Sequence, residues 1–536
     1  DWKVSGRLTL NLGLRYEYEG ATTERDNRNV RGFIPDASLA IAAAAEAAYA
    51  RNPIPEISPS AFRVRGGLGF ASDSERGFYN ADTNNFQPRV GLAYQWNDKT
   101  VVRGGWAIYA VPAIIAGVRQ NGFSQDTQIV PTLDVGLTFR ATLANPFPDG
   151  VADPAGASRG PNTFLGRTLD RLINDINYRN GQSMRWAVSV QRELPGQWVA
   201  EAAYVGNRGY DLTTVDDNNT GIELNGVLRG YLSTLPFRDE AVNSFLTANV
   251  PNPFEGLLPG TGQNGATVQR QQLLRPFPQF ANIRGFAFDG SSEYHAGQFR
   301  LERRFTAGYT LLASYTYSKF TEKVSKLNPT DTEYEERPAE ADIPHRLVVS
   351  GIWELPFGRD RKIGSDWNGL MNGLLGGWST QVIWQTQSGR PITWGSDVYY
   401  NGDPRTLKTD FSDVSNPVFD TSNFYFNDPS IQRNGVPDPA LQRGDRRIQL
   451  VHHLRTFPTR MKDFRRQGLS LWDISLIKRV NVTNRVRMQF HVEFLNAFNT
   501  PVFNAPTLSP TSSLFGRVES QDNLPRDIQL AAKIVF

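Results

Sequence analysis

The chain alternates strictly between apolar and polar residues over segments of about ten residues. In the first segment the apolar side chains are Leu8, Leu10, Leu12, Leu14, Tyr16 and Tyr18. A later one runs through Tyr309, Leu311, Ala313, Tyr315 and Tyr317. Because successive side chains of a strand point to opposite sides of a sheet, each segment predicts a strand with one apolar face and one polar face.

Twelve segments predict strands, at 7–18, 86–96, 100–110, 182–193, 197–206, 294–305, 308–319, 344–355, 378–388, 468–479, 484–496 and 525–536. Short connections, at 97–99, 194–196, 306–307 and 480–483, alternate with long ones, at 19–85, 111–181, 207–293 and 389–467. This sorting of connections is typical of outer-membrane β-barrels, which have short periplasmic turns and long extracellular loops. The link 356–377 departs from it, and we interpret this link as an enlarged periplasmic turn.

The tryptophans support this orientation. Trp96, Trp198 and Trp378 lie beside short turns, and Trp186 lies near the long-loop end of its strand. Such placement predicts aromatic girdles at the two bilayer interfaces. The last strand then runs toward the inner rim, where Phe536 ends the chain. The alternative is a soluble sandwich in which the aromatic side chains form the core.

The polar faces of these strands carry many charged and amide side chains: Arg15, Glu17, Arg103, Arg300, Glu302, Arg304, Gln381, Gln385, Arg487, Gln489, His491, Glu493, Gln529 and Lys533. Unpaired charges are too costly to bury in a dry core, so these residues predict a hydrated lumen. Such a lumen needs roughly 16 or more strands. Asp1 and Trp2, followed by Ser5 and Gly6, resemble the end of an earlier strand entering a turn. We therefore expect residues 1–536 to be the C-terminal part of a transmembrane antiparallel β-barrel that begins upstream.

One helix is predicted, at 37–51, where an alanine-rich segment follows Asp36 as a possible N-cap. We interpret it as a helix within a long loop.

Composition narrows the possible classes of protein. The chain has no cysteine, which excludes disulfide scaffolds, zinc–cysteine sites and thiol catalysis. Its net charge of +3, without basic blocks, argues against nucleic acid as a partner. No apolar run approaches the roughly 20 residues of a transmembrane helix. The chain begins at Asp1 without a signal segment, so we expect a processed or truncated product.

Five blocks of sequence resemble the C-terminal barrel of TonB-dependent outer-membrane receptors, and most closely the Oar-like branch. They are RLTLNLGLRYEYEG (7–20), NNFQPRVGLAYQWNDKTVVRGGWAIY (84–109), DIPHRLVVSGIWELPFGRDRK (342–362), WDISLIKRVNVTNRVRMQFHVEFLNAFNTPVFNAPT (472–507) and PRDIQLAAKIVF (525–536). The resemblance covers the chain from end to end, apart from the long loops.

The resemblance implies a 22-stranded barrel, closed by an N-terminal plug on which the TonB complex pulls to admit a bulky nutrient. It places the plug, the TonB box and about ten strands before Asp1, together with a carboxypeptidase-regulatory-like domain found in many relatives. It also implies that Ile528, Leu530, Ile534 and Phe536 form the signal read by the barrel-assembly machinery.

Several local motifs are candidate sites. The glycines of 260–265 lack the strand that a dinucleotide fingerprint requires, so we interpret this segment as a loop. The acidic run of Asp331, Glu333, Glu335, Glu336, Glu340 and Asp342 could collect a divalent cation. A solvated loop is the simpler interpretation, as it is for the segment 216–219. The five histidines show no metal-ligand spacing, and no catalytic motif is present, so we predict no enzyme activity, metal or cofactor.

Ligand contact is predicted for aromatic residues of one long loop and for the lumen. The candidate residues are Tyr399, Tyr400, Tyr425, His491 and Glu493. Aromatic rings with nearby amides suit sugars or peptides, although loop packing and lipopolysaccharide contact explain them equally well.

The sequence thus predicts an outer-membrane receptor that imports an oligosaccharide, a peptide or a metal chelate. A structural or adhesive surface barrel is the first alternative. A soluble all-β carbohydrate-active protein is the second, and it would need a cleft with paired carboxylates.

Overall fold

The structure of the chain is a computed structural model. It describes all residues except 112–119, 125–128, 130–136, 140, 149, 152, 174–176, 215–220, 236–238, 360, 396–397, 401, 427–451, 484 and 510–511. The acidic segment 216–219 therefore lies outside the described residues.

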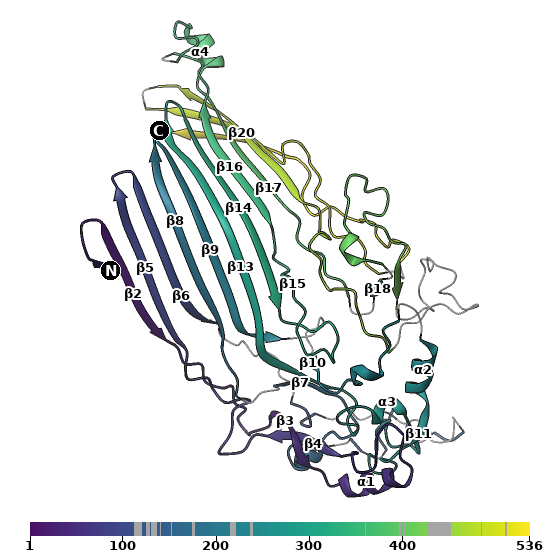
Figure 1. Cartoon of the computed structure of the whole chain (residues 1–536). Coiled ribbons are helices and arrows are strands. Elements are labelled where there is room, and N and C mark those ends of the chain that lie inside the picture. The colour runs from purple at the N-terminus through teal and green to yellow at the C-terminus, as the bar shows by residue number, and fades with distance from the viewer. Residues whose placement is uncertain are drawn as a thin grey trace.

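A single curved sheet of long antiparallel strands dominates the structure (Figure 1). Its order is β1 (Trp2–Lys3), β2 (Leu8–Tyr16), β5 (Phe86–Asn97), β6 (Thr100–Val111), β8 (Gly181–Leu194), β9 (Trp198–Thr214), β13 (Ile283–Thr306), β14 (Tyr309–Lys323), β16 (His345–Glu354), β17 (Trp378–Gln387), β20 (Leu469–Asn481), β21 (Arg487–Leu495) and β22 (Asp527–Val535). Each strand pairs with the wall strand that follows it in the chain, as in an up-and-down barrel wall.

Each of the twelve ranges predicted from alternation overlaps one strand of this wall. The segment before Ser5 is also a strand, since Trp2 pairs with Leu10. The largest difference is at β13, which begins at Ile283, eleven residues before the predicted start at 294. Its first residues leave the wall and pair with the short strands β7 (Leu169–Ile173) and β10 (Ile222–Glu223).

Tight turns join the strands at one end of the sheet. Between β13 and β14 the turn consists of Ala307 and Gly308, which both have positive φ, at 50° and 86°. Thr306 pairs with Tyr309 directly across it. Two such residues in succession match the twist of the flanking strands. The longer link 356–377 lies at this same end and carries α4 (Gly369–Leu375) (Figure 1).

The two faces of the wall differ in chemistry. On one face apolar side chains lie in rows across the strands, as where Ala202, Phe299, Tyr315 and Leu347 are successive partners. Many of them are open to solvent: Phe299 is 55% exposed and Leu530 is 78% exposed. Leu10 and Tyr315 are half-buried. A continuous apolar surface of this kind is unfavourable in water, so this face contacts lipid, and we call it the lipid face.

Aromatic side chains border the lipid face at both ends of the strands. Toward the long connections, the rings of Trp384 and Trp472 stack with their centres 5.0 Å apart. In the same region, the hydroxyls of Tyr204 and Tyr315 lie 2.8 Å from Nδ1 of His295 and His345, respectively. Trp198 and Trp378 lie at the short-turn end. These two belts have the position of the interfacial girdles of membrane barrels.

The long connections fold into a body at the other end of the sheet, which we call the loop cap (Figure 1). It contains the described residues of 17–85, 112–180, 215–282, 324–344, 388–468 and 496–526. Its elements are β3 (Val30–Ser38), α1 (Ala42–Arg51), β4 (Arg65–Phe70), η1 (Gly160–Asn162), η2 (Arg229–Tyr231), α2 (Glu240–Thr247), β11 (Asn249–Pro251), β12 (Thr267–Gln269), α3 (Arg270–Leu273), β15 (Arg337–Pro338), β18 (Val398–Tyr400), η3 (Pro404–Thr406) and β19 (Phe424–Phe426). Four apolar clusters, which contain Phe254, Trp394, Phe280 and Tyr178, respectively, form its core.

The predicted helix exists, but its predicted N-cap is wrong. Asp36 lies in β3, and the helix begins at Ala42 after Ile41, without a side-chain cap. The reason is tertiary: Ser38 pairs with Arg65 of β4, which keeps the chain extended past Asp36. The helix then buries Ala45 and Tyr49 in the core of the loop cap. None of the described helices is long and apolar enough to cross a membrane.

A charge at the middle of the lipid face should be costly. Phe299 lies midway between His295 and Arg303, which are about 26 Å apart along the strand, the scale of the roughly 25 Å apolar band of membrane barrels. We predict that Phe299→Arg lowers the free energy of unfolding in lipid vesicles by about 2–4 kcal/mol. The matched control is Gln298→Arg, on the polar face of the same strand, which should change it little. Equal effects of the two substitutions would contradict the assignment of the faces.

Candidate ligand-binding site

The inner face of the wall, opposite the lipid face, is polar and charged. Arg300 and Glu302 form an exposed ion pair at 2.7 Å, and Arg103 donates to Oε1 of Gln191 at 2.6 Å. The guanidinium groups of Arg89 and Arg185 lie 4.9 Å and 5.1 Å from the ring centre of Tyr109. These groups need water or one another, so this face is a hydrated surface.

The loop cap is anchored beside the start of β13 by Asn225. This fully buried side chain donates from Nδ2 to the carbonyls of Phe277 and Phe280, at 2.9 and 3.1 Å, and accepts the Phe277 amide at 2.8 Å. Glu223 accepts the amides of Asn225 and Ile283. Burial raises the pKa of Glu223, against the opposing effect of these amides and of the Arg284 guanidinium 3.5 Å away. Satisfied polar groups of this kind hold one loop conformation.

Buried arginines join two further loops. Arg337 lies 3.0 Å from Glu322 and 3.3 Å from Glu335, and Arg460 shares Glu322 at 2.7 Å. Arg465 pairs with Asp342 at 2.6 Å and donates to the carbonyls of Asp342 and Gly389. These contacts join the described parts of 324–344 and 389–467.

The same contacts account for the acidic run considered as a cation site. Asp331 pairs with Arg229, Glu336 with Lys323 at 3.0 Å, and Glu340 lies 3.9 Å from Arg460. These three carboxylates lie beside three different cations. Among the described residues, no group of three or more His, Asp or Glu side chains could hold a metal ion.

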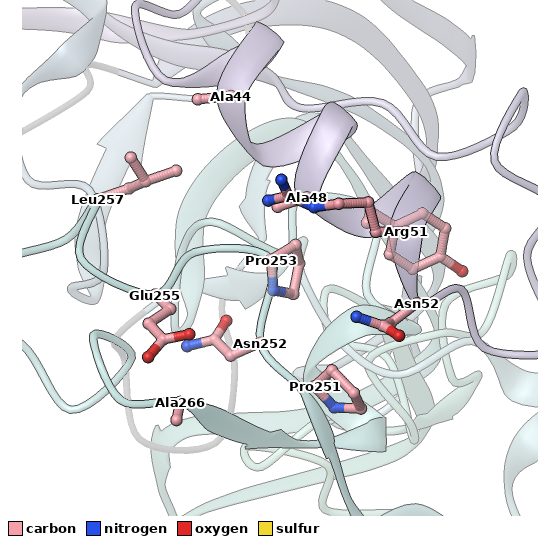
Figure 2. A pocket seen from close by; sticks show the side chains of 11 residues that line it. Ala44, Ala48, Arg51, Asn52, Pro251, Asn252, Pro253, Glu255, Leu257 and Ala266 are labelled. Carbon is pink, nitrogen blue, oxygen red and sulfur yellow. The ribbon is translucent and has the colours of Figure 1, made fainter.

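A cavity of about 270 Å³ lies in the loop cap between α1 and the segment after β11 (Figure 2). Its lining residues are Ala44, Ala48, Tyr49, Arg51, Asn52, Pro251, Asn252, Pro253, Glu255, Leu257 and Ala266. Asn252 is occupied by loop carbonyls, to which its Nδ2 donates at 2.6 and 2.7 Å. Arg51 and Glu255 supply the two charges. The volume is just under the range of typical small-molecule pockets, so the cavity suits a small polar group.

The structure does not bring the residues predicted to contact ligand into one site. Tyr399 and Tyr425 are direct partners in the pairing of β18 with β19, where Tyr400 pairs with Phe424. The ring centre of Tyr400 lies 4.8 Å from that of Phe424 and 5.3 Å from that of Phe457. Burial raises the pKa of the Tyr400 hydroxyl.

His491 and Glu493 lie on the inner face of β21, with Nδ1 and Oε1 3.9 Å apart. Ile528, Leu530, Ile534 and Phe536, predicted as the assembly signal, are all exposed on or just after β22.

Sequence reasoning missed the cavity and the arginine pairs. Their residues are distant along the chain: Arg465 and Asp342 are separated by 123 positions. Neither carries a local motif. The glycines of 260–265 form a loop, in which Asn264 accepts the Leu258 amide at 2.8 Å.

The lipid face, the charged inner face and the sorted connections define an outer-membrane β-barrel protein. The chain belongs to the family described as the outer membrane beta barrel domain, whose family model matches residues 1–529. It is a protein of the bacterial outer membrane. No curated protein sequence matches it significantly.

Solved structures match most of this chain at low sequence identity and with TM-scores below 0.5. The FrpB iron transporter from Neisseria meningitidis is 9% identical, with a TM-score of 0.34; the match covers 88% of this chain and 41% of that one. The outer membrane transporter YddB from Escherichia coli is 11% identical, with a TM-score of 0.35, and the match covers 88% of this chain and 42% of that one. BauA, the ferric preacinetobactin receptor from Acinetobacter baumannii, is 9% identical, with a TM-score of 0.36, and the match covers 88% of this chain and 38% of that one. This chain thus spans about two-fifths of the length of these proteins.

The ion pair between the loops can be tested by removing one partner. Arg465→Gln leaves Asp342, whose side chain is 5% exposed, without its cation. Breaking a buried pair in this way costs about 3–5 kcal/mol. We predict that hydrogen exchange at the Arg466 amide, which donates to Arg390, accelerates accordingly. Arg466→Gln is the control because its side chain is exposed, and protection unchanged in Arg465→Gln would show that the pair does not hold the loops together.

A pH effect is expected where the loop at 452–454 meets residue 233. The Ser233 amide donates to the His452 carbonyl at 2.9 Å, and the Leu454 amide donates to the Ser233 carbonyl at 2.8 Å. Burial lowers the pKa of His452 below its ordinary 6.5, with a further contribution from His453. A lowered histidine pKa stabilises the folded state above the ordinary pKa, and this stabilisation is lost as the pH falls through the lowered value.

Hydrogen exchange at the Leu454 amide should therefore accelerate as the pH falls below 6.5, once its rate is corrected for the intrinsic pH dependence of amide exchange. His452→Gln, which cannot titrate, should remove this dependence. The same pH profile in this variant would assign the effect to another group.

Proposed function

We propose that this chain forms part of the wall and the outward cap of a TonB-dependent outer-membrane receptor that imports a bulky polar solute. The observation that carries the proposal is the hydrated inner face, lined by pairs such as Arg300 and Glu302, on a wall whose other face contacts lipid. A charged, wet surface enclosed by a lipid-facing wall is the environment through which a polar solute crosses a membrane.

The sequence blocks that resemble the Oar-like branch support the same proposal. On this proposal the long connections face outward, and a plug that is not assigned to any residue here couples the barrel to the TonB complex. Ile528, Leu530, Ile534 and Phe536 would present the assembly signal to the barrel-assembly machinery. Oligosaccharides, peptides and metal chelates fit the charged inner face, and no catalytic step or resident cofactor is proposed.

Within this proposal His491 and Glu493 are the contacts offered by the wall. Tyr399 and Tyr425 share one position in the β18–β19 pairing, where they would present aromatic contacts from the loop cap. The packing of Tyr400 against Phe424 favours a supporting role for its ring.

An adhesive surface barrel is the second candidate, and the loop cap favours it. A body with its own apolar clusters and buried ion pairs presents a fixed surface, as a binding module needs. The soluble alternative is not supported, because it would leave the lipid face exposed to water.

Uptake by cells that carry the whole gene separates the two candidates. The solutes are a labelled oligosaccharide, a labelled peptide mixture and a radioactive ferric chelate. We predict that uptake of one of them is lost when either the gene or TonB is removed. Surface retention of the solute that persists without TonB, with no uptake, would favour the adhesive barrel.

Variants of β21 test the inner face. His491→Ala with Glu493→Gln should reduce this uptake, and Val492→Ala, on the lipid face between them, should leave it unchanged.

A further inference from the structure

Arg303 places an unpaired charge on the lipid face at the short-turn end. Its register partners are Trp198 on β9 and Leu311 on β14. The guanidinium carbon lies 3.6 Å from the ring centre of Tyr309 and 5.8 Å from that of Trp198. The residue is only 8% exposed. Nε donates to the Gly196 carbonyl at 3.2 Å, but Nη1 is buried without a hydrogen-bond partner.

No carboxylate oxygen of the described residues lies within 4.0 Å of the Arg303 guanidinium nitrogens, the limit for an ion pair. A buried cation without a counter-ion is costly. The rings of Tyr309 and Trp198 attract the charge, but they leave Nη1 unsatisfied. An external anion at the rim would neutralise the charge that these groups leave uncompensated.

Lys478 repeats this arrangement further along the same rim. It pairs in register with Trp378, and its Nζ lies 5.4 Å from that ring centre. It is 7% exposed, donates to the Gly376 carbonyl, and has no carboxylate partner among the described residues. By contrast, the adjacent Arg479 faces inward and pairs with Glu354 at 3.3 Å. Acids therefore neutralise the inward cation and not the lipid-facing one.

An apolar groove of about 420 Å³ lies on the lipid face between these two cations. Its lining residues are Tyr309, Thr310, Leu311, Val349, Gly351, Ile352, Trp353, Thr380 and Val382, from β14, β16 and β17. Tyr309 belongs both to the groove and to the Arg303 contact. Gly351 leaves the floor open between Leu311 and Val382, its register partners.

We propose that this groove binds an anionic glycerophospholipid, with an acyl chain along the apolar floor and its phosphate on Arg303. Arginine donates in a planar fork that matches phosphate oxygens, and an interfacial cation favours an anionic headgroup. Lys478 provides a second phosphate contact at the opposite side of the groove, for a neighbouring lipid. The site requires only the lipid face and is independent of what the barrel transports.

Native mass spectrometry of the whole chain in detergent tests the headgroup. The probes are phosphatidylglycerol and phosphatidylcholine with the same acyl chains. We expect phosphatidylglycerol to be retained preferentially, and Arg303→Gln to weaken its retention about tenfold, the effect of losing one charged hydrogen bond. Arg303→Lys should keep the preference, and Arg304→Gln, at the exposed neighbouring residue, should not alter it. Equal retention of both lipids, or unchanged retention in Arg303→Gln, would overturn the proposal.

A second variant tests the groove without changing any charge. Val349→Trp should fill the groove and reduce phosphatidylglycerol retention. Val492→Trp, on the lipid face of β21 outside the groove, should leave it unchanged. Both variants add bulk toward lipid rather than into a packed core, and circular dichroism verifies that the strands are retained. Normal retention in a folded Val349→Trp would show that the groove holds no lipid.

Discussion

The structure depends on one constraint: a single layer of backbone separates an apolar medium from water. Every peptide group within the wall must be paired by a neighbouring strand, because lipid offers no hydrogen bonds. Alternate side chains of each strand then point to opposite sides of the wall, so that Phe299 contacts lipid while Arg300 contacts water. The exposed apolar stripe, the charged inner face and the two aromatic belts all follow from this division.

The loop cap obeys a different rule. Its segments leave the wall and must satisfy their own polar groups while burying enough apolar surface to stay folded. Asn225 satisfies several backbone polar groups of 277–281 by hydrogen bonding to them. The cluster around Trp394 buries apolar surface. Buried pairs such as Arg465 with Asp342 then fix the loops relative to each other. The wall is therefore held by ladders of adjacent strands, and the cap by contacts between distant segments.

This difference explains what the sequence could reveal. The side of the sheet to which a residue points depends only on its position in its own strand. The alternation of apolar and polar residues therefore located each of the twelve predicted strands and the residues that face lipid. It missed the first residues of β13, because glycines at 285 and 290 interrupt the alternation and the pairing partners are cap strands. It also misplaced the start of α1, since the pairing of Ser38 with Arg65 cannot be read from the helix itself. The contacts of the candidate site, such as Tyr400 on Phe457, are equally non-local.

The face on which a charged residue lies also determines how its charge can be stabilised in such a wall. Lys478 and Arg479 are neighbours in the chain, yet within the described part of the chain only the inward Arg479 has a carboxylate partner, Glu354. On the inner face, water and fixed acids can stabilise a cation, so an ion pair there is a local structural feature. On the lipid face, a fixed acid would itself have to be buried, whereas a lipid brings its charge together with an apolar tail. An unpaired cation at the rim, resting on Trp378 or Tyr309, is therefore more consistent with a mobile external anion than with a missing acidic residue.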